Sequence, residues 1–145
     1  MPAPQARSRP RVLIAEDDDS LRRLLEMRLT AGGYETRGAA AGLLALEVVD
    51  GWTPDIVVCD VMMPHMSGLS VARELRVRAD TLSVPILFLT ARCFDEDIQE
   101  VMALGGMTYV GKPFDFTRLE ATLRSLLGDG EHTVEPAVTV ANEGT

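Results

Sequence analysis

The chain has 145 residues, of which 46% are apolar, 25% charged and 5% aromatic, and its formal net charge is −8. This length is typical of one globular domain with a proper core. The acidic balance disfavours direct binding of nucleic acid, since phosphate contacts need clustered Lys and Arg. No apolar run reaches the roughly 18 residues of a membrane span. Cys59 and Cys93 lack metal-ligand spacing, so we expect reduced thiols in a cytoplasmic protein without membrane contact.

Short apolar runs alternate along the chain with segments of helical spacing. In chain order they predict a strand at Val12–Ala15, a helix at Leu21–Leu29 closed by Gly32 and Gly33, a strand at Tyr34–Arg37, a helix at Leu43–Val48, a strand at Ile56–Cys59, a helix at Leu69–Leu75, a strand at Ile86–Leu89, a helix at Ile98–Met102 ending at Gly105, a strand at Tyr109–Val110 and a helix at Leu119–Leu127. Such alternation indicates a parallel sheet with helices on both faces. The first, third and fourth strands are the most apolar and should be central, whereas the short, polar second strand suits an edge.

Both ends of the chain lack this pattern. The Pro-rich start, residues 1–10, is expected to be a flexible tail with a few arginines. Residues 11–127 form the predicted domain, and residues 128–145 show no convincing period, so they are expected to be a second flexible tail.

Polar side chains stand at the carboxyl ends of the predicted strands. Glu16 and Asp17 follow the first strand, Asp60 the third, Thr90 the fourth, and Lys112 comes shortly after the fifth. In an open parallel sheet of order 2-1-3-4-5 these groups would converge on one crevice, where such folds bind ligands. Lys112 is also the only lysine among 14 basic residues.

This combination of groups has a specific chemistry. Carboxylates without His or Cys are hard oxygen ligands suited to Mg²⁺ or Mn²⁺. A carboxylate held beside such a cation can attack phosphorus and form an aspartyl phosphate. An ammonium group and a hydroxyl group can then stabilise the charge on the phosphoryl oxygens. Two further carboxylates, Asp18 and Asp19, precede Leu21 and are expected to cap the first helix.

Four motifs carry a family resemblance: VLIAEDD, PDIVVCDVMMPHMSG, PILFLTAR and YVGKPF. In this order and spacing they resemble the response-regulator receiver domain, similar to the chemotaxis receiver CheY, over about Arg11–Leu127. The resemblance implies a flavodoxin-like, doubly wound (βα)5 fold with a five-stranded parallel sheet of order 2-1-3-4-5. It favours a stand-alone, single-domain response regulator.

The resemblance also implies roles for individual residues. Asp60 matches the phosphoacceptor, and Glu16 and Asp17 match the acidic pair that binds Mg²⁺ together with Asp60 and the backbone carbonyl of Met62. The remaining matches are the switch hydroxyl of Thr90, the mobile aromatic ring of Tyr109 and the phosphate-contacting Lys112, whose bond to Pro113 is usually cis.

The implied function is phosphorelay signalling. A sensor histidine kinase or a histidine phosphotransfer protein would donate the phosphoryl group, and the face formed by the last two helices and the fifth strand would then control a protein target. Such a protein is a phosphoacceptor that catalyses only its own phosphotransfer and dephosphorylation, as a monomer or a phosphorylation-dependent dimer. Phe94 and Met107 suggest a partly apolar patch for a protein partner.

Other classes remain open at this point. A flavodoxin-like cofactor binder would need a hydroxyl- and Gly-rich loop after the first strand, where this chain has carboxylates. An aspartate-nucleophile phosphatase would need a second Asp two residues after the nucleophile, where this chain has Met62. The chain could also be a receiver fragment of a larger transcriptional regulator, or a degenerate receiver that binds partners without phosphorylation.

Overall fold

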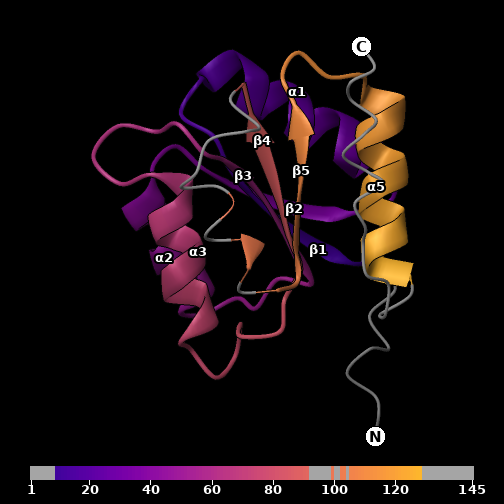
Figure 1. Ribbon diagram of the computed structural model, residues 1–145. Helices are drawn as coiled ribbons and strands as arrows, with labels where there is room; N and C mark the ends of the chain where they lie inside the picture. Colours follow the sequence, from indigo (N-terminus) through magenta and orange to yellow (C-terminus); the bar gives the residue numbers. More distant parts are fainter. Residues whose placement is uncertain (1–8, 92–98, 100–101, 104, 129–145) are drawn as a thin grey trace, which may run out of the picture.

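The computed structural model describes residues 9–91, 99, 102, 103 and 105–128. Strands and helices alternate along it (Figure 1): β1 (Arg11–Ala15), α1 (Asp19–Ala31), β2 (Glu35–Ala39), α2 (Gly42–Val49), β3 (Ile56–Asp60), α3 (Gly68–Arg76), β4 (Ile86–Thr90), β5 (Met107–Gly111) and α5 (Phe116–Gly128). The strands form one parallel sheet of order β2-β1-β3-β4-β5, which confirms the predicted doubly wound fold. Residues 1–8 and 129–145 of the predicted tails, and half of the residues of the helix expected at 98–105, lie outside the described residues, while Gly128 ends α5.

Helices cover both faces of the sheet (Figure 1). Side chains alternate along each strand, so Val57 of β3 and Phe88 of β4 pack on the side of α2 and α3. Ile56 and Leu87, one residue away, pack on the side of α1 and α5. Every residue of β3 and β4 is buried, as expected for central strands covered on both sides.

The second strand runs two residues further than its pattern predicted. Tyr34 is buried but precedes the strand, which continues through Gly38 and Ala39. Gly38 pairs with Ile14 of β1. A Cβ at position 38 would overlap the carboxylate of Glu26 on α1, so the glycine leaves room for the end of this side chain.

Two expectations about surface residues are corrected. Met107, proposed for an apolar patch, is the first residue of β5 and is only 7% exposed, because it packs into the core on the side of α2 and α3. Its suggested companion, Phe94, lies outside the described residues. On α2 the apolar spacing correctly predicted a helix, but Leu43 and Leu44 are exposed while Ala45, Leu46 and Val49 face the core.

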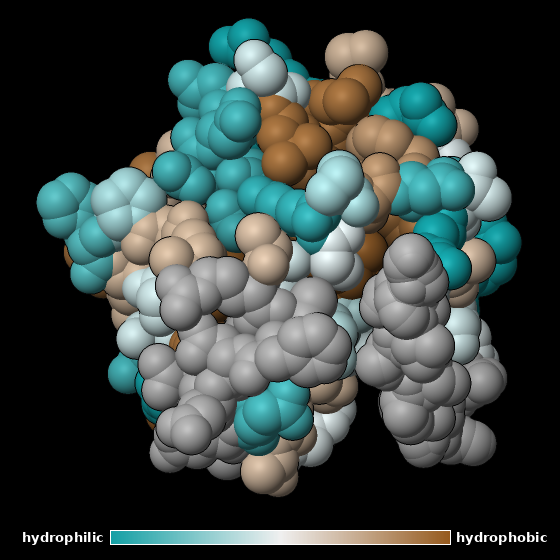
Figure 2. Space-filling view, turned by 45° about the horizontal axis from the view of Figure 1, so that its top comes forward, coloured by the Kyte–Doolittle hydropathy of each residue, from teal (hydrophilic) through white to brown (hydrophobic). Residues whose placement is uncertain are grey.

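Some hydrophobic side chains do reach the surface, as the brown atoms in Figure 2 show among hydrophilic ones. The large exposed ones in the described part of the chain are Leu24, Met27, Leu43, Leu44, Met62, Val77 and Leu82. None of the helices described has the length and apolarity that a bilayer crossing demands.

The tryptophan side chain lies at the edge of the sheet where β1 and β2 begin. Trp52 is 4% exposed, and its indole N–H donates to Glu35 over 3.2 Å. The guanidinium carbons of Arg11 and Arg37 lie 5.3 and 5.0 Å from its ring centroid. Both cations therefore lie within cation–π range of the ring.

Candidate functional site

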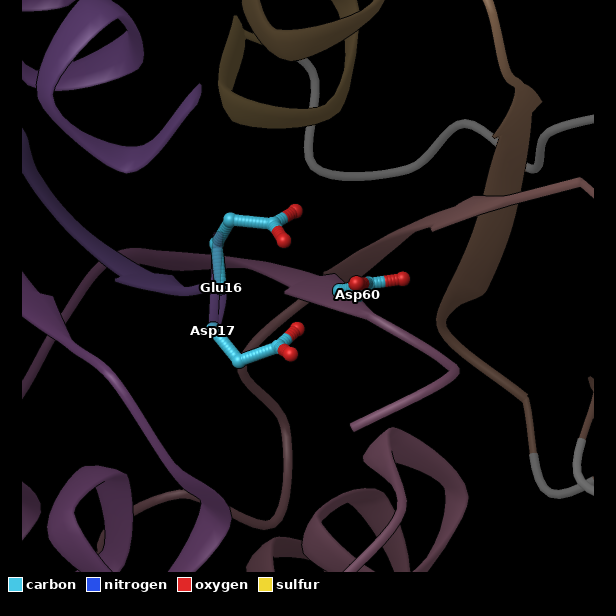
Figure 3. Close-up of side chains that lie close together, drawn as sticks. All are labelled: Glu16, Asp17 and Asp60. Carbon is cyan, nitrogen blue, oxygen red and sulfur yellow. The ribbon is translucent and has the colours of Figure 1, made fainter. Parts of the chain in front are cut away.

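Three carboxylates meet at the carboxyl edge of the sheet. Glu16 and Asp17 follow β1 directly, and Asp60 ends the neighbouring strand β3. One oxygen from each of the three lies within 4.8 Å of the others. Figure 3 shows the side chains of Glu16 and Asp17 leaving the end of β1 and turning toward Asp60. The predicted convergence of these residues is therefore what the structure shows.

The carboxylates differ in their access to water. Glu16 and Asp60 are 1% and 4% exposed, whereas Asp17 is exposed. Two nearly buried anions side by side repel each other and lose hydration, which costs free energy unless positive charge is near. The cluster therefore needs a compensating cation.

Lys112 supplies part of this compensation. Its Nζ lies 3.3 Å from Oδ2 of Asp60 and 3.4 Å from Oε1 of Glu16. The backbone N–H of Lys112 donates to the carbonyl of Thr90 over 2.9 Å, which ties the loop after β5 to the end of β4. The Lys112–Pro113 peptide bond is cis, as the resemblance implied.

The electrostatics of the site shift two pKa values. Burial raises the pKa of Glu16 to about 7, and the charge of Asp60 adds to this increase, while the Asp18 N–H and Lys112 oppose it. Burial disfavours the charge on Lys112, but attraction to and hydrogen bonds with Asp60 and Glu16 outweigh it and raise its pKa. The site thus holds a firmly charged ammonium beside a carboxyl group that keeps its proton more readily than usual.

The loop after β3 holds Asp60 from the other side. The backbone N–H of Met62 donates to Oδ1 of Asp60 over 3.2 Å, and the Met62 side chain is exposed. Gly68, at the start of α3, lies so close to the strand end that a Cβ there would overlap the carbonyl oxygen of Asp60. The start of α3 and the phosphoacceptor candidate are thus in direct contact through their backbones.

Thr90 and Tyr109 occupy neighbouring strands near this edge. Thr90 is fully buried and ends β4, where it pairs with Gly111 of β5. Tyr109 is half-buried on β5 and pairs with Phe88. Thr90 therefore lies on the strand next to the one that carries Asp60, and Tyr109 lies one strand further out.

The turn between β1 and α1 has one predicted and one unpredicted feature. Asp18 is the N-cap of α1 and accepts from the N–H groups of Ser20 and Leu21, and Asp19 lies in the first turn, so the capping prediction is confirmed. Sequence reasoning missed Arg22, whose Nη1 donates to the backbone carbonyl of Glu16 over 2.9 Å. The only signal in the sequence is an arginine six residues after a strand-end acid, a pattern too common to select.

The donor set fits a hard divalent cation. Carboxylate oxygens are the ligands that Mg²⁺ and Mn²⁺ prefer, and Mg²⁺ commonly keeps several waters, for which the exposed side of Asp17 leaves room. A divalent ion would also offset the repulsion between Glu16 and Asp60. The charge, the ligand type and the spacing of the three carboxylates therefore all favour a divalent cation.

Known proteins share this architecture. The family described as response regulator receiver domain matches residues 12–124. A probable transcriptional regulator, ycf27 of Cyanophora paradoxa, is 42% identical over 120 residues, which cover 83% of this chain and 49% of the relative. The chain thus spans about half the length of the curated relatives it matches.

Solved structures agree with the fold. The chemotaxis protein CheY4 of Vibrio cholerae superposes with a TM-score of 0.78 at 33% identity, covering 82% of this chain and 99% of that protein. The response regulator TrrA of Thermotoga maritima, solved in complex with Mg²⁺-BeF, gives a TM-score of 0.71 at 33% identity, covering 81% and 99%. The family match, the sheet order and the carboxylate cluster agree. This chain belongs to the response regulator receiver domain family.

Proposed function

We propose that this receiver domain accepts a phosphoryl group on Asp60 with Mg²⁺ bound by Glu16, Asp17, Asp60 and the backbone carbonyl of Met62. The observation that carries the proposal is the contact of Lys112 with both Asp60 and Glu16 inside the carboxylate cluster. A site that served only to cap a helix would not need a lysine drawn in from the far end of the chain. The binding of Mg²⁺-BeF by the Thermotoga response regulator supports the choice of ion.

The reaction is a displacement at phosphorus. A carboxylate oxygen of Asp60 attacks the phosphorus atom, the bond from phosphorus to the donor atom breaks, and the donor leaves with the electron pair. When bound, Mg²⁺ supplies charge neutralisation to the phosphoryl oxygens. Lys112 adds a point charge beside Oδ2 of Asp60, and the Met62 N–H keeps Asp60 oriented through Oδ1.

The signal would be read through Thr90 and Tyr109. A phosphoryl group on Asp60 would offer a charged acceptor to the Thr90 hydroxyl, and the movement of Thr90 would leave space for the ring of Tyr109. Thr90 lies in β4, next to β3, and Tyr109 lies in β5, next to β4, so a local change at Asp60 could pass through β4 to the outer face of β5 and α5. The fold would stay the same, but phosphorylation would shift the population between two conformations, and a partner would bind one of them better.

Receiver domains pair with histidine kinases, and we propose a sensor histidine kinase or a histidine phosphotransfer protein as the donor. For the output we propose a protein target, because the net charge of −8 argues against direct contact with nucleic acid by this domain. Regulation of transcription as part of a longer protein is the second candidate, favoured by relatives such as ycf27 that are about twice as long as the matched segment.

The deciding experiment is intact-mass spectrometry after incubation with acetyl phosphate and Mg²⁺. We expect one added phosphoryl group in the wild-type chain and none in Asp60→Asn or in EDTA. Equal labelling in EDTA would contradict the role of the metal. A wild-type chain that stays unlabelled, yet still binds a partner, would indicate a degenerate receiver.

A further inference from the structure

The backbone of Glu16 is fixed on both sides of the residue. Its N–H donates to the carbonyl of Ala39 on β2 over 3.0 Å, as a continuation of the strand pairing. Its own carbonyl accepts from Nη1 of Arg22 on α1 over 2.9 Å. Because Glu16 is 1% exposed, its carbonyl needs a protein partner, and Arg22 provides one.

Arg22 also holds the other side of Asp17. The backbone N–H of Arg22 donates to the carbonyl of Asp18 over 2.9 Å, as the first turn of α1 requires. Asp17 therefore lies between two residues whose carbonyls both accept from Arg22. The peptide that joins Glu16 to Asp17 is oriented by the guanidinium group, and this peptide sets the direction in which both side chains leave the backbone.

The guanidinium group itself has little freedom. Its Nη2 donates to Asp19 over 2.7 Å, and the side chain is 16% exposed. Its stem passes over Gly38 of β2, where a Cβ would come within 3.1 Å of the Arg22 Cδ. The Glu16 carbonyl and the exposed Asp19 carboxylate accept from two different nitrogens of one planar guanidinium group, an arrangement that a lysine ammonium cannot reproduce.

We infer that Arg22 is a positioning residue for the acidic cluster: by orienting the Glu16–Asp17 peptide it aims both carboxylates at the metal site. This inference rests on the proposed function, because it requires that the cluster binds Mg²⁺. Arg22 touches none of the three carboxylates through any contact described, so its effect passes through the backbone. Groups that orient metal ligands from behind can change metal affinity by about 10–100-fold.

Simple electrostatics makes the opposite prediction. Removing a positive charge near a cation site should tighten the binding of Mg²⁺. Loss of positioning should weaken it. The sign of the change in the Mg²⁺ dissociation constant therefore separates the two effects.

The experiment compares three variants of the full chain by isothermal titration calorimetry with Mg²⁺, at a temperature at which circular dichroism shows all of them folded. Arg22→Met keeps most of the aliphatic part of the side chain and removes the guanidinium hydrogen-bond donors, and we expect the affinity for Mg²⁺ to fall by about tenfold. Arg22→Lys keeps the charge but loses the planar guanidinium group, so a smaller loss of about threefold is expected. Arg23→Met removes the same charge from an exposed neighbour, and its effect should stay below about twofold.

An Arg22→Met protein that binds Mg²⁺ as tightly as wild type, or more tightly, overturns the inference and leaves the proposed function intact. A wild-type chain that shows no Mg²⁺ binding overturns both. If Arg22→Met does not fold, Arg22→Lys decides alone: weaker binding supports positioning, and unchanged binding overturns it.

Discussion

The ammonium group of Lys112 is shared by two nearly buried carboxylates, Asp60 and Glu16. Replacing Lys112 with methionine keeps most of its stem but leaves these anions facing each other. We expect Lys112→Met to lower the free energy of unfolding in EDTA by about 1–2 kcal/mol. This loss is smaller than for a fully buried ion pair, because the lysine is 27% exposed and water screens its charge. Urea denaturation with EDTA and with Mg²⁺ measures this, and Mg²⁺ should narrow the difference from wild type.

Lys112→Arg is the matched control, because it keeps the charge. We expect partial phosphorylation in this variant, but a defective conformational switch, since a larger planar group cannot take the place of a compact ammonium. The same loss of stability for Lys112→Met with and without Mg²⁺ would show that the lysine acts through packing alone. Partner binding equal to wild type in Lys112→Arg would contradict its role in the switch.

Glu16 makes the stability of the metal-free protein depend on pH. Burial raises its pKa in the folded protein from 4.5 to about 7, so between these values the folded chain holds a proton that the unfolded chain has released. Stability is then fully present below about pH 4.5 and declines as the pH rises through 7. We expect a decline of up to about 3 kcal/mol in EDTA.

Glu16→Gln isolates this effect, because glutamine has nearly the same shape and does not titrate. Urea denaturation from pH 5 to pH 8 in EDTA should give a flatter profile for this variant than for wild type. Parallel profiles would assign the pH dependence to other groups.

Among the elements, α3 begins directly against the backbone of Asp60. A Cβ at Gly68 would overlap the carbonyl oxygen of Asp60 and lie 2.9 Å from the sulfur of Cys59. Gly68→Ala must therefore push α3 away from β3 and is expected to cost about 1–3 kcal/mol. Chemical denaturation measures the loss, and intact-mass labelling should also slow, because the same backbone carries Asp60.

Gly51→Ala is the control at the end of α2. Nothing lies within 4 Å of a Cβ built at Gly51, so this substitution should change the stability by less than about 0.5 kcal/mol. A loss for Gly51→Ala as large as that for Gly68→Ala would show that loss of glycine flexibility, and not the close approach of α3, causes the effect.

The elements were predictable where one local rule decided them. Alternating apolar runs and the Gly32–Gly33 pair placed β1, α1, β3 and β4 within one or two residues. The apolar pattern was a poorer guide where packing against a neighbouring element decided which residues belong to a strand or face the core. Gly38 interrupts an apparent strand, yet pairs with Ile14, and its lack of a Cβ leaves room for the Glu26 side chain of α1. On α2, Leu43 and Leu44 are exposed, because the face of the helix that packs on the core carries Ala45, Leu46 and Val49.

For the whole molecule, Mg²⁺ should act as a stabilising ligand. An ion that binds only the folded chain adds about 2.7 kcal/mol when its concentration is a hundred times the dissociation constant. We expect Tm to rise with Mg²⁺ concentration in wild type, and to rise much less in Asp17→Asn, which weakens one ligand on the exposed side of the cluster. Differential scanning calorimetry provides the measurement. An equal rise in both proteins would place the ion elsewhere.

At the scale of the whole molecule, the sequence predicts some residues of the carboxylate site and not others. The strand ends indicated Glu16, Asp17, Asp60 and Lys112, because sheet topology alone brings carboxyl ends together. The sequence could not indicate Arg22, because whether its long side chain reaches a backbone carbonyl depends on the distance between α1 and β1. Nor could it show that Met107 is buried, since that depends on packing across the sheet.

The indole of Trp52 is buried near two guanidinium groups at the start of β1 and β2, so its fluorescence can report selectively on unfolding. It is the only tryptophan, and it lies at the opposite end of the strands from the carboxylates. Its emission should shift to longer wavelength on unfolding, when water replaces the enclosing side chains. Mg²⁺ or beryllofluoride should leave the spectrum of the folded protein nearly unchanged. Intrinsic fluorescence would then follow denaturation without interference from ligand binding, while amide exchange in residues 105–112 follows the switch.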